Sequence, residues 1–200
     1  MTKLLFFVNF LKFVEILVFM IKGKRIKFAP IERKHIDNFL KWFNDPEITQ
    51  YVTMYKPMTR DMEEEWFDSL KHKENAIYFS ILLLDQEEPE KIVGNCAIQD
   101  INSKNRACSC GITIGEKEYQ NKGLGTEAME MLVEYGFNTL NMNRIELSVY
   151  EFNIRAYKSY QKVGFVEEGR KRQARYHNGK YYDEIIMAIL REDWESKKTN

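Results

Sequence analysis

The sequence predicts an α+β fold of three layers, in which a mixed central sheet has helices on both faces. Helical periodicity comes early, between residues 30 and 70. Short apolar runs separated by polar turns follow, as in an antiparallel meander. From residue 110 onward, strand and helix patterns alternate and end in a hairpin. Two hundred residues suffice for one domain with a hydrophobic core.

The first strand is expected at residues 25–29, and two helices follow it. Pro30 begins the first helix. Its apolar residues recur at helical spacing and face a core; they are Ile36, Phe39, Leu40 and Phe43. Thr59 is the expected N-cap of the second helix, which runs through Trp66 and Leu70.

The antiparallel meander is predicted from two strands, at residues 77–84 and 92–99, because apolar and β-branched residues dominate both runs. The polar residues 85–90 form the hairpin turn between them, and residues 102–105 form the next turn. A further strand at residues 110–114 begins the alternating half of the chain.

The second half of the chain alternates helix and strand. A strongly periodic helix spans about Thr126 to Leu140, and its apolar face is made by Met129, Leu132, Val133, Gly136 and Leu140. A strand at residues 145–149 and a helix after Asn153 follow. Asn178-Gly179, between two further strands, is a strong signal for a two-residue hairpin turn.

The most informative stretch is the loop from Gln120 to Thr126, which lies between the strand at 110–114 and the long helix. Its two glycines, Gly123 and Gly125, let a ligand approach the backbone closely. The unpaired N–H groups in the first turn of the helix then point at the ligand, as in sites for phosphate groups. Taken alone, the loop is equally compatible with a surface turn that caps the helix.

Two other phosphate-binding motifs fit less well. The chain has no Gly-x-x-x-x-Gly-Lys-Ser/Thr spacing, which excludes a Walker-type loop. Residues 123–128 match the Gly-x-Gly-x-x-Ala of a dinucleotide site, with Glu146 as the ribose-binding acid. However, the polar segment 116–122 separates the strand from Gly123, and Glu146 lies near the start of its strand rather than at its end.

Four segments together resemble the GNAT superfamily of acyl-CoA-dependent N-acetyltransferases. Gln120-x-x-Gly123-x-Gly125 resembles motif A of the superfamily, and residues 153–165 resemble its Asn-x-x-Ala-x-x-x-Tyr-x-x-x-Gly-Phe signature. Residues 42–48 and the tail from 175–183 onward resemble the RimJ/RimL branch, the ribosomal-protein N-terminal acetyltransferases and their relatives. The resemblance covers about residues 24–194.

The resemblance implies the three-layer GNAT acyltransferase fold in a domain of residues 24–196, with acetyl-CoA as the co-substrate. The backbone of the glycine loop is expected to bind the pyrophosphate of acetyl-CoA; this set is Gln120, Asn121, Lys122, Gly123, Leu124, Gly125 and Thr126. In the family, the preceding strand diverges from its neighbour and offers its edge to the pantetheine amides; here that edge is Ile112, Thr113 and Ile114. Asn153 is a further amide partner, the N-cap of the following helix, or both.

Tyr160 is the expected general acid, because by family resemblance it stands beside the thioester sulfur. CoA leaves as a thiolate, and it is expelled more readily when a proton arrives. A tyrosine with a pKa of about 10 can protonate a thiol-class leaving group with a pKa of about 8.5, helped more by its position than by driving force.

The general base is not fixed by the sequence. Many relatives have a glutamate on the strand before the glycine loop, and the alignment puts Ser109 at that position. A serine cannot take a proton at pH 7, but it can hold a water that does. An α-amine with a pKa of about 8 needs less help from a base than a lysine or polyamine amine with a pKa of about 10.4. Other candidate bases are Asp100, Glu63 and Glu64.

Cys108 and Cys110 offer a different route, in which a thiol carries the acetyl group. No histidine is placed in the sequence to activate them, and buried cysteines usually behave as small hydrophobic residues. Direct attack of the amine on the thioester in a ternary complex is therefore the expected mechanism.

The expected acceptor is the N-terminal α-amine of a protein or peptide. A small-molecule amine such as a polyamine, an aminoglycoside or an amino sugar is an alternative, and so is a non-catalytic acyl-CoA-binding module. The acceptor pocket is expected between the first two helices and the C-terminal hairpin; its candidate residues are Trp42, Asn44, Tyr55, Trp66, Tyr176, Tyr182 and Asp183.

Composition narrows the class of partner. The 30 basic and 30 acidic residues balance, so no net field attracts the chain to nucleic acid. Three unevenly spaced cysteines indicate a reduced, cytoplasmic protein rather than a disulfide scaffold. The cysteines and the three scattered histidines lack zinc-site spacing, so no metal is expected. A monomer or a homodimer is expected.

Residues 1–22 form an apolar extension before the domain. The segment barely crosses a bilayer core of roughly 30 Å, and its internal charges, Lys12 and Glu15, are costly there. Its basic end lacks the small-residue cleavage site of a signal peptide. Three accounts stay open: a misassigned start with Met20 as the first residue or a dispensable extension, a helix packed on the domain or a partner, and membrane contact through residues 1–20.

Overall fold

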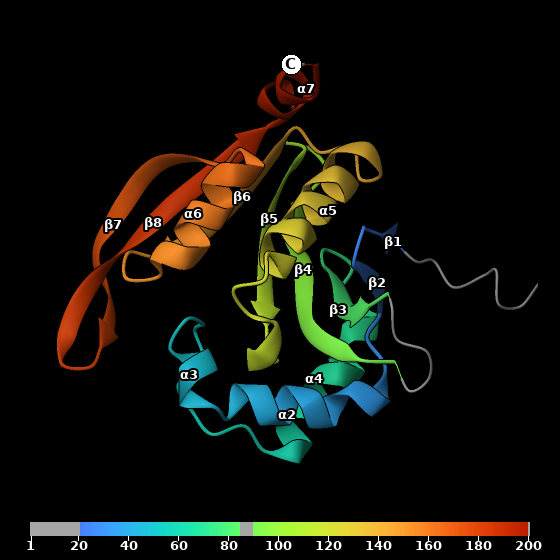
Figure 1. Cartoon of the computed structure of the whole chain (residues 1–200), viewed down its shortest axis with the longest axis vertical. Helices are drawn as coiled ribbons and strands as arrows, with labels where there is room; N and C mark the ends of the chain where they lie inside the picture. Colours follow the sequence, from blue (N-terminus) through green and yellow to red (C-terminus); the bar gives the residue numbers. More distant parts are fainter. Residues whose placement is uncertain (1–20, 85–89, 200) are drawn as a thin grey trace, which may run out of the picture.

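An eight-stranded mixed sheet forms the middle layer of the protein (Figure 1). The computed structural model describes residues 21–84 and 90–199. The strands run in the order β1-β2-β3-β4-β5-β6-β8-β7, and neighbours are antiparallel except for β5 and β6. Their bounds are β1 (Ile21–Lys22), β2 (Ile26–Pro30), β3 (Ile77–Leu83), β4 (Ile92–Asn102), β5 (Ala107–Ile114), β6 (Arg144–Tyr150), β7 (Val166–His177) and β8 (Lys180–Leu190).

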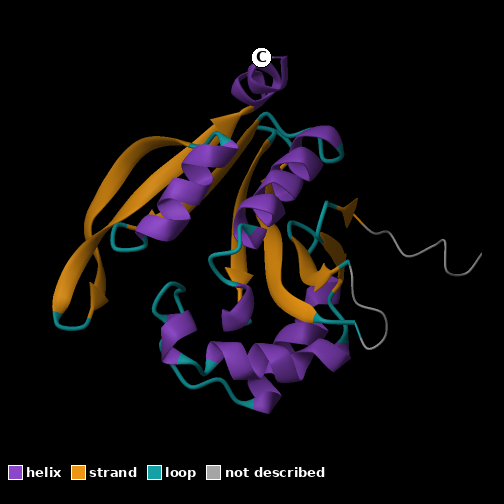
Figure 2. Cartoon of the chain, viewed as in Figure 1, coloured by secondary structure: helices purple, strands orange, loops and turns teal. Residues whose placement is uncertain are grey.

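Helices lie on both faces of this sheet (Figure 2). The larger hydrophobic core contains α5 (Leu124–Asn138) and α6 (Ile154–Val163), and the second core cluster contains residues of α2 (Ile36–Phe43) with α4 (Arg60–Ser69) packed against it. Phe28 of β2 belongs to the first cluster and the adjacent Ala29 to the second, because successive residues of a strand face opposite sides. The predicted three-layer α+β architecture is confirmed.

The described residues contain five further helical segments; they are η2 (Arg33–His35), α3 (Pro46–Thr49), η3 (Leu70–His72), η4 (Lys117–Tyr119) and α7 (Arg191–Thr199). The sequence pattern does not predict α3, because four residues are too few to show a period. Its local signals are Asp45, whose side chain accepts a hydrogen bond from the N–H of Glu47, and Pro46 at the first helical position.

The first long helix begins later than expected. Pro30 is the last residue of β2, and the 3₁₀ turn η2 precedes α2, which begins at Ile36. A proline fits a strand end because it has no N–H to donate there. The N-cap predicted at Thr59 is confirmed, since its side chain accepts a hydrogen bond from the N–H of Met62 at 3.3 Å.

The predicted turn of the C-terminal hairpin is also confirmed. Asn178 (φ 48°) and Gly179 (φ 81°) both occupy the left-handed region, as a type I′ turn requires. The hairpin extends beyond the layer of α6, and its outer strand β7 is largely exposed. Its tip and α3 line one cavity, so the hairpin and the N-terminal helical layer meet at this end of the molecule (Figure 1).

β5 and β6 pair over only three residues, from Ala107 opposite Arg144 to Ser109 opposite Glu146. Beyond Ser109 the two strands diverge (Figure 1). β5 stays paired with β4 on its other side, and β6 stays paired with β8. The β6-facing edge of the second half of β5 therefore has no strand partner, as the family resemblance implies.

The sheet begins inside the stretch assigned to the N-terminal extension, because Ile21 and Lys22 pair with β2. Residues 1–20, on which the three accounts of the extension depend, lie outside the described residues, as does most of the turn predicted at 85–90. Within residues 21–84 and 90–199, no helix combines the length and the apolarity needed to cross a membrane.

Candidate active site

A cavity of about 490 Å³ lies between the diverging ends of β5 and β6. Its other walls come from residues 48–53, the loop at 119–123, the start of α5, and α6. Tyr160 and nine of the predicted cofactor-binding residues line it; the nine are Ile112, Thr113, Ile114, Gln120, Asn121, Gly123, Gly125, Thr126 and Asn153. The fold thus brings the two motif regions, which are separate in sequence, to one cavity.

Lys122 and Leu124 do not line this cavity with the other loop residues. The Leu124 side chain is buried in the larger core. The Lys122 ammonium lies 5.4 Å from the centre of the Tyr119 ring, and the Lys122 carbonyl accepts a hydrogen bond from Arg25 Nη1 at 2.7 Å. Because its side chain is buried, Leu124 can make the predicted contact only through its backbone.

The loop before α5 has the backbone conformation of an anion cradle. Asn121 (φ 59°) and Gly123 (φ 79°) both occupy the left-handed region. Gly123 is the N-cap residue of α5 and has no side chain to bond the N–H groups of the first turn, so these groups are left for a ligand. A Cβ atom at Gly125 would lie 3.4 Å from Ile112 Cδ1, which shows how closely α5 approaches β5 at the cavity.

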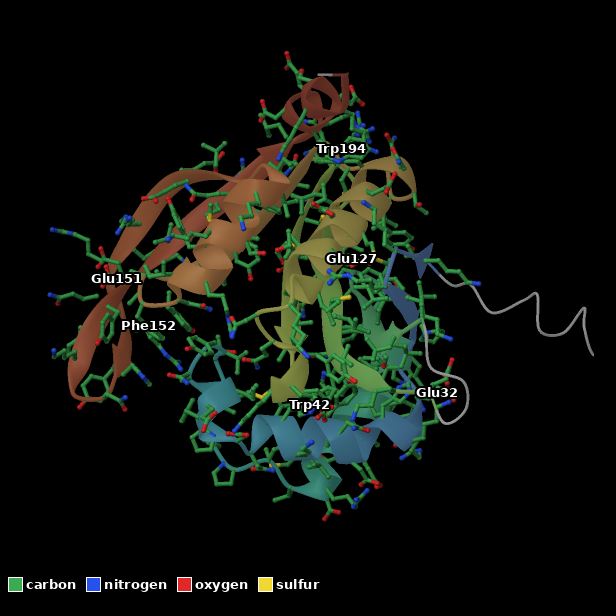
Figure 3. The ribbon with its side chains drawn as sticks, in the orientation of Figure 1. Glu32, Trp42, Glu127, Glu151, Phe152 and Trp194 are labelled. Atoms are coloured by element: carbon green, nitrogen blue, oxygen red, sulfur yellow. The ribbon has the colours of Figure 1, made fainter. Side chains whose placement is uncertain are left out.

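A long-range ion pair holds the start of α5 against β2. The Glu127 carboxylate accepts hydrogen bonds from the N–H groups of Lys24 and Arg25, at 2.8 and 2.7 Å, and from Arg25 Nε at 2.8 Å (Figure 3). Burial of Glu127 tends to raise its pKa, but the hydrogen bonds from Arg25 outweigh burial and lower it. Sequence reasoning missed this pair, because its members are about a hundred residues apart and no local signal joins them.

Arg155 is a second residue that sequence reasoning missed. Its Nη1 donates to Gln120 Oε1 at 2.9 Å and to Asn121 Oδ1 at 3.3 Å, and its guanidinium lies 5.6 Å from the centre of the Tyr51 ring. The charged side chains that line the cavity are all basic; they are Arg155, Lys158 and Lys162. Positive charge on α6 therefore faces the cradle, which suits a ligand with phosphate groups.

Tyr160 is buried at the wall of the cavity, with 8% of its surface exposed. Burial raises its pKa above the ordinary value, the nearby Cys110 raises it further, and Arg155 lowers it. The phenol is therefore protonated throughout the neutral range and can donate a hydrogen bond or a proton to an atom in the cavity.

The structure places Ser109 away from the cavity, contrary to the expectation for a base or a water-holding residue. Ser109 lies where β5 and β6 are still paired, and its Oγ donates to Asp100 Oδ2 at 2.7 Å on an exposed face. Glu63 and Glu64 lie on α4 and do not line the cavity either. Spacing from the glycine loop identified the position of Ser109, but it could not tell where the two strands begin to diverge.

The cysteines are buried and form no disulfide; they are Cys96, Cys108 and Cys110. Burial raises the pKa of Cys108 to about 12 and raises that of Cys110 as well. Cys110 Sγ lies 3.6 Å from Met129 Sδ. A thiol whose pKa is this high is hardly ionised at neutral pH, so it is a poor nucleophile. Among the described residues, no cluster of three or more His, Cys, Asp and Glu could hold a metal ion.

Asn153 caps α6, since its Oδ1 accepts a hydrogen bond from the N–H of Ala156 at 3.2 Å. We expect Asn153→Ala to lower the free energy of unfolding by about 1 kcal/mol, because the variant loses this cap. Urea unfolding measures the change. Asn153→Ser is the control, since serine caps nearly as well as asparagine; equal losses in both variants would contradict the assignment.

The residues expected to line an acceptor pocket divide into two groups. A second cavity of about 540 Å³, between α3 and the β7–β8 hairpin, is lined by Tyr55 and Tyr176. Tyr182 lies beside it, with its ring 4.9 Å from that of Phe152, and Asp183 Oδ1 accepts a hydrogen bond from the N–H of Gln173. Residues of the segment 48–55 line both this cavity and the first one, so the segment separates the two cavities.

The other three expected pocket residues are structural, which corrects the prediction. Trp42 is buried between α2 and the end of β5, and its Nε1 donates to Glu116 Oε1 at 2.9 Å (Figure 3). Trp66 packs edge-on against Phe39. Asn44 bonds both backbone polar groups of Met58. The two tryptophans pack in the core and the asparagine forms hydrogen bonds with a loop. Residue type alone therefore did not distinguish these residues from ligand-binding ones.

Comparisons with known proteins agree with the fold and the cavity. Residues 25–166 match the family model described as acetyltransferase (GNAT) domain. An uncharacterised N-acetyltransferase from Bacillus licheniformis is 28% identical over 86% of this chain and 96% of its own length. Spermidine N(1)-acetyltransferase from Escherichia coli (strain K12) is 28% identical over 84% of this chain and 88% of its own length.

A solved structure gives the same result. Spermidine N-acetyltransferase from Vibrio cholerae, in complex with CoA and spermine, superposes with a TM-score of 0.77 at 25% identity, over 85% of this chain and 98% of that one. The match to the family model covers well over half of the 200 residues. The chain therefore belongs to the GNAT acetyltransferase family, and it is an acyltransferase that takes an acetyl group from acetyl-CoA and transfers it to an amine.

Proposed function

We propose that the protein acetylates the N-terminal α-amine of a peptide or protein. The observation that carries the proposal is the charge of the two cavities. Their described lining residues include arginine, lysine and histidine but no aspartate or glutamate. An α-amine with a pKa of about 8 is partly uncharged near neutral pH and needs no carboxylate beside it. A polyamine keeps several positive charges, which basic walls repel and neighbouring carboxylates would stabilise.

Two resemblances support a protein acceptor. Residues 42–48 and the segment 175–183 are similar to the RimJ/RimL branch. A putative ribosomal N-acetyltransferase from Bacillus subtilis (strain 168) is 30% identical, over 54% of this chain and 58% of its own length. Assignment to that branch is part of the proposal.

The residues of the first cavity have distinct roles in the proposed reaction. The cradle at 120–126 and Arg155 bind the pyrophosphate of acetyl-CoA, through backbone N–H groups and positive charge. The unpaired edge of β5 at Ile112–Ile114 binds the pantetheine amides, together with Asn153. The thioester then lies beside Tyr160, and the amine attacks its carbonyl carbon directly from the side of residues 48–53.

Tyr160 protonates the departing sulfur in this scheme. Burial raises the pKa of the phenol, which by itself makes proton transfer to a thiolate less favourable. The same burial also raises the pKa of a thiol held beside it, as it does for Cys110. The two groups therefore stay closely enough matched for transfer within the cavity. The amine loses its proton to water, since no described carboxylate lines the cavity to act as a base.

A polyamine acceptor is the second candidate, and the relatives favour it. Two proteins similar to this chain along most of its length are named spermidine acetyltransferases, and one of them has been solved with spermine. The acid-free lining of both cavities argues against this candidate. The two readings differ in the acceptor alone, so one assay separates them.

We expect purified protein to release CoA from acetyl-CoA faster with α-amine peptides than with spermidine. The panel contains peptides with N-terminal Ala, Ser or Met, each beside its N-terminally blocked form, together with spermidine, lysine and an aminoglycoside. The blocked peptides are the matched control, because they differ only in the reacting amine. A kcat/KM for spermidine above that of every free peptide would overturn the proposal. Binding of acetyl-CoA, seen as higher thermal stability, without turnover on any amine would indicate a non-catalytic acyl-CoA-binding module.

A further inference from the structure

Arg175 of β7 reaches across to the segment that walls the first cavity. Its Nη2 donates to the Val52 carbonyl at 2.9 Å, and its guanidinium lies 4.7 Å from the centre of the Tyr150 ring. Val52 and Tyr150 line the first cavity, whereas Arg175 itself lines the second. The guanidinium is therefore fixed at the boundary between the two cavities, beside the segment 48–53 from which the amine is proposed to attack.

The Arg175 guanidinium has hydrogen-bonding capacity that the described residues do not use. Its Nε is buried without a hydrogen-bond partner, and no carboxylate among the described residues forms an ion pair with Arg175. Most other arginines of the described chain do have a carboxylate partner; these are Arg25, Arg33, Arg60, Arg144, Arg170 and Arg191. The buried Nε does not reach the cavity, but a partly buried guanidinium without a carboxylate partner is costly unless a ligand at its other N–H groups supplies the negative charge.

The other cavity arginine is Arg155, whose charge already serves the cradle through Gln120 and Asn121. Arg175 comes from a different element and contacts Val52 and Tyr150 rather than Gln120 and Asn121, so its charge is not used by the residues of the cradle. A planar guanidinium presents two parallel N–H donors, which match a carboxylate better than a single charged atom.

We propose that Arg175 binds a carboxylate of the acceptor, so that the protein selects amines that carry a nearby negative charge. This inference rests on the proposed transfer to an α-amine and narrows its substrate class. The carboxylate comes either from an acidic side chain next to the N-terminus of a peptide or from the α-carboxylate of a free amino acid. Both present the same group, which lies closer to the amine in the free amino acid than in the peptide.

Matched acceptors test the inference. One pair is Ser-Asp-Ala-Ala-amide and Ser-Asn-Ala-Ala-amide, which differ in one carboxylate; the other pair is free serine and serinamide. We expect wild-type kcat/KM to favour the charged member of at least one pair by about tenfold or more, as a charge-assisted hydrogen bond provides. The preferred pair identifies the source of the carboxylate. The preference should shrink at high ionic strength.

Arg175→Gln should bring that ratio close to one, mainly by raising KM for the charged acceptor. The ratio is the readout because Arg175 also bonds the Val52 carbonyl, and a purely structural defect would lower activity on both members equally. Arg172→Gln is the matched control: it removes the same charge from the exposed face of the same strand and should leave the ratio unchanged.

Two results would overturn the inference: a wild-type ratio near one in both pairs, or a preference that Arg175→Gln retains. In either case, turnover of the neutral peptide would leave the proposed function standing. If neither peptide is acetylated, transfer to a peptide α-amine fails instead, and the serine pair still tests the carboxylate site.

Discussion

Replacement of Tyr160 by phenylalanine is expected to lower kcat by about 100-fold or more. The ring fills the same buried volume, so the fold and the cavity wall are retained, and only the hydroxyl that would donate to the departing sulfur is lost. The hydroxyl acts on a charge that develops in the transition state, so acetyl-CoA binding should change little. Stopped-flow or steady-state release of CoA measures kcat, and calorimetry measures the dissociation constant of acetyl-CoA.

Tyr157→Phe is the matched control for this prediction. Tyr157 lies one turn earlier on α6 and does not line the cavity; its hydroxyl donates to Glu167 Oε2 at 2.9 Å. The same atom is deleted from the same helix, and kcat should stay close to that of the wild type. If both variants keep full activity, another group or water protonates the sulfur and Tyr160 is a wall residue.

The pH dependence gives an independent check on Tyr160. Burial raises its pKa above the ordinary value of about 10, so the phenol stays protonated across the range in which the protein is assayed. The rise of activity with pH should therefore follow deprotonation of the acceptor amine, with no decline caused by loss of the Tyr160 proton.

The features that sequence reasoning predicted well depend on chemistry within a few residues. Thr59 and Asn153 are caps because a short polar side chain meets an N–H group three residues later. Asn178-Gly179 is a hairpin turn because few residue pairs tolerate two positive φ angles. The glycine loop has the backbone conformation of an anion cradle for a similar reason, since Gly123 adopts a positive φ where α5 begins. Such features need no knowledge of the tertiary structure.

The features that sequence reasoning missed depend on residues that are far apart in the sequence. Glu127 looks like an ordinary first-turn acid until β2 brings Arg25 to it. Trp42 has the residue type of a pocket wall, but Glu116 and the core account for it. The lack of a carboxylate in the two cavities is likewise a property of several elements at once. A motif fixes positions along a strand, whereas only the assembled sheet shows which positions face the ligand.

Glu63 is expected to make stability fall as pH rises, and Glu63→Gln should remove this effect. Glu63 lies on α4 with 2% of its surface exposed, and burial raises its pKa from 4.5 to about 7. The native state therefore holds the proton more tightly than the unfolded chain does. Stability due to this proton is fully present below about pH 4.5, falls between pH 4.5 and 7, and is absent above pH 7.

The free energy of unfolding of Glu63→Gln should increase relative to that of the wild type as pH increases. A pKa difference of this size corresponds to about 3 kcal/mol, so Glu63→Gln should be more stable than the wild type by about 3 kcal/mol at pH 8 and by less than about 1 kcal/mol at pH 5. Urea unfolding at the two pH values measures both differences. The exposed neighbour Glu65 provides the control, since Glu65→Gln makes the same change on the solvent side of the same helix and should show no such pH dependence. A Glu63→Gln difference that is equal at pH 5 and pH 8 would mean that the native protein hydrates this carboxylate, and that α4 does not seal it from water.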